Sequence, residues 1–197
     1  MRCHRLSVFT MLLFSLLSCS LTARQQSPTF DSVYTVVTSS QQIPNVIPAP
    51  TNTPILTITG NFNATQEGVN ASIPSISMDR SLIEAVGTVE YTVRDPFERE
   101  DTTFQGVLFR DLLSLWQVPE TAQQLTITAL NDYQVQVPVA LLKEYPVLLA
   151  FKQNGQVMTR DYRGPAMLVT PIDQYPNVPE LTNREYWAWQ ISTIHIE

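Results

Sequence analysis

The chain of 197 residues contains two cysteines, Cys3 and Cys19, and both lie near its N-terminal end. The rest of the sequence therefore offers no pair of thiols for a disulfide and no thiolate ligand for a metal. A domain built from these residues must be stabilised by an apolar core, for which its length suffices.

The N-terminal residues have the pattern of a secretory signal. Arg2 and Arg5 precede an apolar run from Leu6 to Leu17, and basic residues before a short apolar stretch are typical of a cleavable signal peptide. The run is shorter than the roughly 20 apolar residues that a membrane-spanning helix requires. We therefore predict a signal peptide over residues 1–18.

The sequence Leu16-Leu17-Ser18-Cys19 resembles a bacterial lipobox, in which cleavage precedes an acylated cysteine. Acylation of Cys19 would anchor the mature protein to a membrane by lipid. Ser20 follows, where an Asp would signal retention at the inner membrane, so the outer membrane is favoured. Ordinary cleavage after Ser20 or Ala23 is the alternative. These features predict a periplasmic location in a Gram-negative bacterium.

The charge balance excludes some classes of partner. Lys and Arg number 12 against 18 Asp and Glu, giving a net charge of −6, and Lys143 and Lys152 are the only lysines. Without a basic stripe, nucleic acid and anionic lipid headgroups are not expected partners. Isolated arginines can still form a local anion site.

Composition divides the chain into a tether and a domain. Residues 19–54 are rich in Ser, Thr, Gln and Pro and predict a flexible tether, although 32–38 is also compatible with a short strand. No helix can run through its four spaced prolines, Pro44, Pro48, Pro50 and Pro54. Residues 55–197 then predict one folded domain.

Apolar periodicity within this domain predicts many strands and few helices. We expect strands over 55–60, 88–93, 125–130, 133–137, 147–152, 166–170 and 188–196. Short helices are predicted over 78–85, 104–116 and 139–143. This mixture indicates a single, β-rich α+β domain.

Several motifs occur in an order that carries a resemblance. They are Gly60 after the first strand, Phe104-Gln105-Gly106-Val107-Leu108, Leu130-Asn131-Asp132-Tyr133, Leu149-Ala150-Phe151, Arg163-Gly164-Pro165 and Trp187-Ala188-Trp189. In this order and spacing the chain resembles the molybdopterin-binding domain of the sulfite oxidase family (SUOX fold). The resemblance covers about residues 55–197.

The chain departs from that family at its metal ligand. Family enzymes place a metal-binding cysteine after the second strand, where this chain has Tyr91-Thr92-Val93-Arg94-Asp95-Pro96. A lysine that helps to hold the cofactor is replaced by Ala188. The pattern is more similar to a cysteine-less branch of small periplasmic pterin-binding proteins (PruR-like).

That resemblance implies a non-catalytic protein that binds a reduced pterin, such as a tetrahydro form, without molybdenum. Members of the branch are implied to act on the periplasmic domain of a membrane-bound GGDEF- or EAL-type protein, which makes or degrades cyclic di-GMP in biofilm regulation. Two alternatives remain open: a molybdopterin-dependent oxidoreductase, and a structural envelope lipoprotein.

A pterin ring needs a carboxylate acceptor for its amino and ring N–H groups, a donor for its carbonyl, and an aromatic face for stacking. Asp132 is the predicted acceptor, and Asn131 and Tyr133 flank it. Asn131-Asp132 is equally consistent with a plain hairpin turn, and Tyr133 with a core position.

Two arginines are candidate donors. Arg163 precedes Gly164-Pro165, where the family backbone approaches the cofactor, and Arg184 matches the region of a family cofactor-binding arginine. Arg163 would donate to the pterin carbonyl or to a phosphate, and it is also compatible with a solvated loop. Arg94, in the former metal region, is expected to fill the vacated volume with charge.

Three aromatic residues are candidates for the ring-stacking face: Tyr175, Trp187 and Trp189. On a strand Trp187 and Trp189 would share one face, and we expect one to be core and the other to reach the pocket.

Other chemistries are disfavoured by the residue types available. Beyond the predicted signal peptide His195 is the only imidazole, so a zinc site or a histidine-based triad is not expected. Glu98, Glu100 and Asp101 lack the spacing of a calcium loop and predict a solvated loop.

Overall fold

A computed structural model describes residues 29–41, 43–69 and 74–197. The predicted signal peptide and the lipidation site Cys19 lie outside the described residues. Within the described ranges, no helix combines the length and apolar character needed to cross a membrane.

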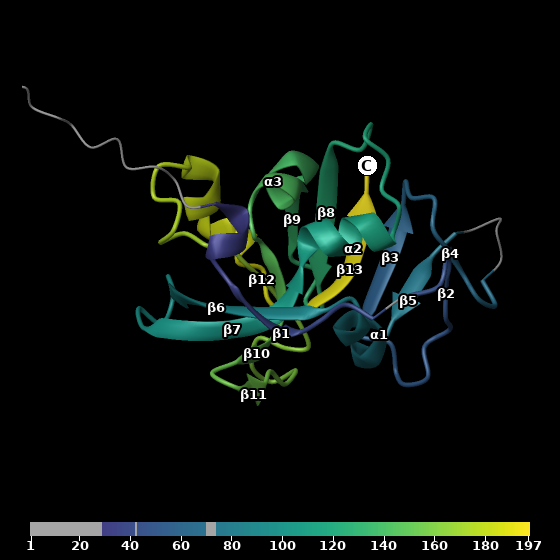
Figure 1. The fold of residues 1–197 in the computed structure, drawn as a ribbon, viewed down its shortest axis with the longest axis horizontal. Helices are drawn as coiled ribbons and strands as arrows, with labels where there is room; N and C mark the ends of the chain where they lie inside the picture. The colour runs from purple at the N-terminus through teal and green to yellow at the C-terminus, as the bar shows by residue number, and fades with distance from the viewer. Residues whose placement is uncertain (1–28, 42, 70–73) are drawn as a thin grey trace, which may run out of the picture.

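Two sheets form the body of the domain (Figure 1). The larger has the strand order β1-β6-β7-β10-β11, and β12 also pairs with β10. Its strands are β1 (Thr35–Thr38), β6 (Thr88–Arg94), β7 (Asp101–Leu108), β10 (Leu148–Gln153), β11 (Gln156–Val157) and β12 (Met167–Val169).

The second sheet has the order β5-β3-β13-β8-β9, in which β13 and β3 are parallel. Its strands are β3 (Leu56–Gly60), β5 (Ile76–Met78), β8 (Gln124–Ala129), β9 (Gln134–Pro138) and β13 (Ile191–Ile196). A small parallel pair joins β2 (Val46–Ile47) and β4 (Thr65–Gln66).

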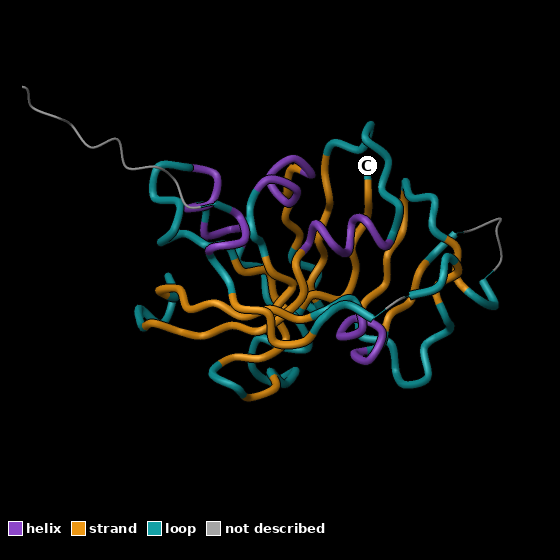
Figure 2. The backbone as a smooth tube through the Cα atoms, viewed as in Figure 1, coloured by secondary structure: helices purple, strands orange, loops and turns teal. Residues whose placement is uncertain are grey.

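Helices are short and lie around the sheets (Figure 2). They are α1 (Arg80–Ala85), α2 (Phe109–Leu115) and α3 (Val139–Glu144), with 3-10 turns η1 (Phe30–Ser32), η2 (Pro179–Thr182) and η3 (Arg184–Tyr186). The β8–β9 hairpin, the strand at β3 and the helices α1 and α3 confirm the sequence predictions.

The apolar core is divided between two clusters. The larger includes Phe109 and Trp116 of the α2 region, which are fully buried. The smaller lies on the large sheet around Phe104 and includes Trp187, with Phe30 and Trp189 packed against it. Burial of these side chains supplies the stability that the domain cannot gain from a disulfide.

The predicted helix over 104–116 is wrong in its first half. Residues up to Leu108 form β7, and only Phe109–Leu115 is helical. Residue 106 packs closely against the neighbouring strand β10. A Cβ there would lie 2.2 Å from the carbonyl oxygen of Leu149, so the glycine allows β7 and β10 to pair. Pairing with β6 and β10 outweighs the helical spacing of the apolar residues.

The predicted strand over 188–196 begins later, at Ile191. Gln190 has a left-handed φ of 57°, which interrupts extended backbone. Its N–H donates instead to the carbonyl of Arg163, at 2.9 Å. Trp187 and Trp189 therefore do not share a strand face, contrary to the sequence prediction.

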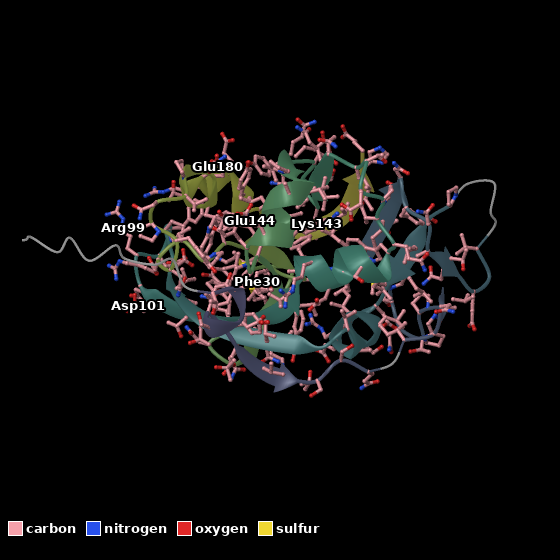
Figure 3. All side chains as sticks on the ribbon, turned by 45° about the horizontal axis from the view of Figure 1, so that its top comes forward. Phe30, Arg99, Asp101, Lys143, Glu144 and Glu180 are labelled. Carbon is pink, nitrogen blue, oxygen red and sulfur yellow. The ribbon has the colours of Figure 1, made fainter. Side chains whose placement is uncertain are left out.

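The described part of the predicted tether is folded onto the domain. β1 pairs with β6, β2 pairs with β4, and Ile47 is buried in the larger core cluster. The Arg110 guanidinium lies 3.6 Å from the centroid of the Phe30 ring and bonds Asp31 at 3.2 Å. Phe30 thus lies on the body of the domain (Figure 3), because tertiary contacts overcome the proline-rich composition.

A buried carboxylate fixes another part of this segment. Asp79 caps α1 by accepting from the Leu82 N–H at 2.9 Å, and it also accepts from the Asn52 N–H at 2.8 Å and the Ser81 hydroxyl at 2.6 Å. Burial alone would raise the pKa of Asp79, but these hydrogen bonds outweigh it and lower the pKa to about 2.

We predict that Asp79→Asn lowers the free energy of unfolding at pH 7 by about 2 kcal/mol. Because the folded-state pKa is depressed, this stabilisation is complete above the unfolded value near 3.8 and is lost as pH falls through 2. Urea unfolding should show that the difference in free energy of unfolding between the wild type and Asp79→Asn disappears as the pH falls from 3.8 to 2. The exposed control Glu67→Gln should unfold like the wild type throughout.

Candidate ligand-binding site

A cavity of about 390 Å³ lies where the β8–β9 turn, the loop after β6 and the segment before β13 meet. Its walls combine aromatic rings with a few polar groups. The lining residues are Phe97, Ala129, Asn131, Tyr133, Arg184, Glu185, Trp187, Ala188 and Trp189. The structure thus brings together five predicted site residues: Asn131, Tyr133, Arg184, Trp187 and Trp189.

The aromatic side chains of the cavity differ in how deeply they are buried. Trp187 is 2% exposed, and its indole N–H donates to the Thr170 hydroxyl at 2.7 Å. Trp189 is half-buried and packs edge-on against Phe97, with ring centroids 5.1 Å apart. Phe97 itself is 43% exposed. One fixed indole and two more accessible rings therefore offer flat apolar surface to a ligand.

Polar groups of the cavity come from η3 and the β8–β9 turn. The Asn183 side chain caps η3 by accepting from the Glu185 N–H at 3.1 Å, which places Arg184 and Glu185 side by side in the cavity lining. The Tyr133 hydroxyl lies 3.5 Å from the Glu185 carbonyl. A carboxylate acceptor and a guanidinium donor thus accompany the aromatic walls.

Beside the cavity lies a buried ion pair between Asp95 and Arg163. The Asp95 side chain is 0% exposed and that of Arg163 3%. Both terminal nitrogens of Arg163 donate to the Asp95 carboxylate, and one also bonds Glu98 at 3.2 Å. Burial would raise the pKa of Asp95, but the bonds from Arg163 and from the N–H groups of Phe97 and Glu98 lower it.

The ion pair is connected to the cavity wall. The Arg163 guanidinium lies 5.3 Å from the Trp189 ring centroid, a cation–π distance. Asp95 also accepts from the Phe97 N–H at 2.8 Å. Both aromatic rings of the accessible wall are therefore positioned by residues of the pair.

Three residues singled out from the sequence lie outside the lining of this cavity. Asp132 is an exposed turn residue with a φ of 64° and is not among the cavity-lining residues. Tyr175 is buried and packs edge-on against Tyr145, also outside the lining. Arg94 is 60% exposed and bonds Asp101, so Asp95 and Arg163, rather than Arg94, bring charge into the former metal region.

Sequence reasoning missed Phe97, Glu185 and Asp95. Glu185 directly follows the predicted Arg184, and this position next to a candidate residue was its only signal in the sequence. Phe97 lies in a loop without periodicity and gave no signal. Asp95 directly before Pro96 is typical of a turn, but its burial depends on Arg163, 68 positions later.

The fold and the cavity define a β-rich α+β domain of a cofactor-binding type. Residues 84–174 match the family model described as the oxidoreductase molybdopterin binding domain. The chain is also similar to the crystal structure of the sulfane dehydrogenase SoxCD from Paracoccus pantotrophus, with a TM-score of 0.53 and 15% identity. That likeness covers 72% of this chain and 37% of the other. No curated protein sequence matches the chain.

The family match over residues 84–174 and the likeness of the fold support the superfamily that the sequence motifs predicted, that of the sulfite oxidase-type molybdopterin-binding domains. The family match spans the elements from β6 to β12, and the structural likeness covers 72% of the chain. The predicted single-domain, mixed and sheet-rich fold class is confirmed.

The residues fit the cofactor of this superfamily only in part. An aromatic cavity with one acid and one base suits a flat heterocycle. In the stretch where family enzymes carry their thiolate, the buried side chain is the Asp95 carboxylate, which is committed to Arg163. Among the described residues, no group of three His, Cys, Asp or Glu side chains is placed to hold a metal ion.

We predict that Asp95→Ala lowers the free energy of unfolding by about 3–5 kcal/mol, because the buried Arg163 loses its buried partner and keeps only the half-exposed Glu98. The double variant Asp95→Leu/Arg163→Leu should lose less than the two single leucine changes added together. Denaturant unfolding of the wild type, the two single leucine variants and the double variant measures this coupling. Arg94→Ala, which removes an exposed pair, should cost less than about 1 kcal/mol; additivity at Asp95 and Arg163 would contradict the expected coupling.

Proposed function

We propose that this chain is a non-catalytic periplasmic protein that binds a pterin and relays its presence to a membrane-bound cyclic di-GMP signalling protein. The observation that carries the proposal is the aromatic cavity beside the Asp95–Arg163 pair. The cavity offers the surface and the polar groups that a pterin ring requires, in a domain whose metal-ligand stretch has no thiol.

In this proposal the pterin ring stacks on Trp189 and Phe97. The Glu185 carboxylate accepts from the amino group and the adjacent ring N–H, and Arg184 donates to the carbonyl. Glu185 takes the role that the sequence suggested for Asp132, because Glu185 lines the cavity. Asn131 and Tyr133 complete the wall on the β8–β9 side.

The absence of catalysis is inferred from the same residues. A molybdenum thiolate requires an ionised sulfur, and the aspartate nearest to that role is engaged by Arg163 and by two backbone N–H groups. We therefore propose a free pterin as the ligand, without molybdenum. A molybdopterin-dependent oxidoreductase is the alternative that metal analysis would reveal.

Transmission to the partner is proposed to run through the loop after β6 and the segment after β12, which is bonded to the end of β6. The Arg94 N–H donates to the Asp173 carboxylate at 2.5 Å, and the Gln174 side chain donates to the Thr92 carbonyl at 3.2 Å. A ring bound between Phe97 and Arg184 would contact both loop regions. It would bias their arrangement if it bound one state more tightly than the other.

The proposed partner is the periplasmic domain of a GGDEF- or EAL-type membrane protein. A lipid on Cys19 would hold this chain at a membrane surface, with the outer membrane favoured. These two proposals rest on the sequence resemblance and on the lipobox.

We expect the protein purified from a periplasm to bind a pterin without stoichiometric molybdenum. Mass spectrometry of the extracted ligand, quenching of tryptophan fluorescence on titration with reduced and oxidised pterins, and metal analysis of the same sample test this. Stoichiometric molybdenum would restore the oxidoreductase, and failure of every pterin to bind would favour a structural envelope lipoprotein.

Single substitutions should identify the cavity as the pterin site. Trp189→Ala and Glu185→Gln are each expected to weaken binding about tenfold, equivalent to about 1.4 kcal/mol. Asp132→Asn, which also removes a carboxylate near the cavity but not from its lining, should leave the affinity unchanged. Isothermal titration of the three variants measures this, and a loss confined to Asp132→Asn would reverse the assignment of the acceptor.

A further inference from the structure

A second hollow adjoins the aromatic cavity along β8 and β9. It is a groove of about 790 Å³ whose walls are mainly hydroxyl, amide and carboxylate groups. The lining residues are Thr126, Tyr133, Gln134, Val135, Gln136, Asn183, Glu185, Tyr186 and Glu197. Tyr133 and Glu185 line both hollows, so the groove and the ring cavity share a wall.

The charge of the groove has one sign. Glu185 and Glu197 are its charged lining residues, and within the described part of the chain neither has a Lys or Arg within ion-pair distance. The groove residue Tyr186 also lies near acidic side chains. Burial raises the pKa of its hydroxyl most, and the negative charges of Glu180 and Glu185 raise it further.

The strand that lines the groove is the last of its sheet. β9 pairs with β8 alone, and η3 lies beside it, so an extended segment would lie across the outward-facing side chains of β9. The side chains of Gln134 and Gln136 alternate with the buried Val135 and Val137 and face outward. Amide side chains along a strand can bond the backbone of a chain that lies across them.

We propose that this groove binds an extended basic segment of a partner protein, with Lys or Arg side chains near Glu185 and Glu197. Charge complementarity selects this occupant, because the groove lining has two carboxylates and no cation and the chain carries a net charge of −6. An acidic segment would meet repulsion there. The inference rests on the proposed relay function and names where the partner docks.

The shared wall gives the relay a physical route. A ring bound in the cavity contacts Tyr133 and Glu185 on one side, and the basic segment contacts the same residues on the other. The bound ring would restrict the side chains of Tyr133 and Glu185, so the segment would lose less conformational entropy when it binds. The ring should therefore increase the affinity for the segment. By thermodynamic reciprocity the segment should increase the affinity for the ring by the same factor.

A defined probe tests the groove on the whole protein. Fluorescence anisotropy should show binding of a labelled heptapeptide of alternating lysine and threonine, and no binding of the matched peptide of glutamate and threonine. Glu185→Gln/Glu197→Gln should weaken the basic peptide about five- to tenfold, the effect of two solvent-exposed ion pairs. The control Glu67→Gln/Glu84→Gln removes the same charge beside β4 and α1, far from the groove (Figure 1), and should change the affinity less than twofold.

Equal losses in the two double variants, or no binding of the basic peptide, would overturn the proposal. The single change Glu197→Gln separates it from the pterin proposal, because Glu197 lines the groove and not the ring cavity. It should weaken the peptide and leave pterin affinity unchanged. Peptide binding without pterin binding would refute the pterin function alone, and pterin binding without peptide binding would refute the groove alone.

Discussion

A buried charge is stable only when an opposite charge or hydrogen bonds compensate for its lost hydration. Asp95 and Arg163 compensate each other in this way beside the cavity. The loop after β6 and the turn before β12 are joined by this pair. Phe97 is bonded through its N–H to Asp95, and Trp189 lies next to the Arg163 guanidinium. The accessible aromatic wall of the site therefore depends on an interaction between residues that do not themselves line that cavity.

The pair also shows what occupies the stretch after β6 in this domain, which has no thiol. Asp95 lies in the stretch where the superfamily's enzymes carry their metal-binding cysteine, and its carboxylate binds a guanidinium instead of a metal. The surrounding core needs no disulfide, because two apolar clusters cover the sheets. The aromatic cavity thus lies beside a structural ion pair.

Sequence periodicity predicted the elements whose pattern depends on local burial. The β8–β9 hairpin, α1 and α3 were found in this way, and the ordered motifs predicted the superfamily. The pattern failed at β7, where close packing at Gly106 requires a strand, and at residues 188–190, where the left-handed Gln190 delays β13. At residues 35–38 the strand agrees with the short strand that the sequence left open over 32–38, whereas residues 46–47 gave no such signal and form a strand because a distant segment pairs with them.

For the site, the sequence by itself determined the residue types: the tryptophans and Arg184 before the last strand, the polar turn at Asn131, and the lack of cysteine after Cys19. Only the tertiary structure decided which of these residues meet. It placed Glu185 rather than Asp132 in the cavity and engaged Arg163 with Asp95. The physical reason is that side-chain partners are set by long-range packing, whereas a linear pattern reports only local burial and backbone preference.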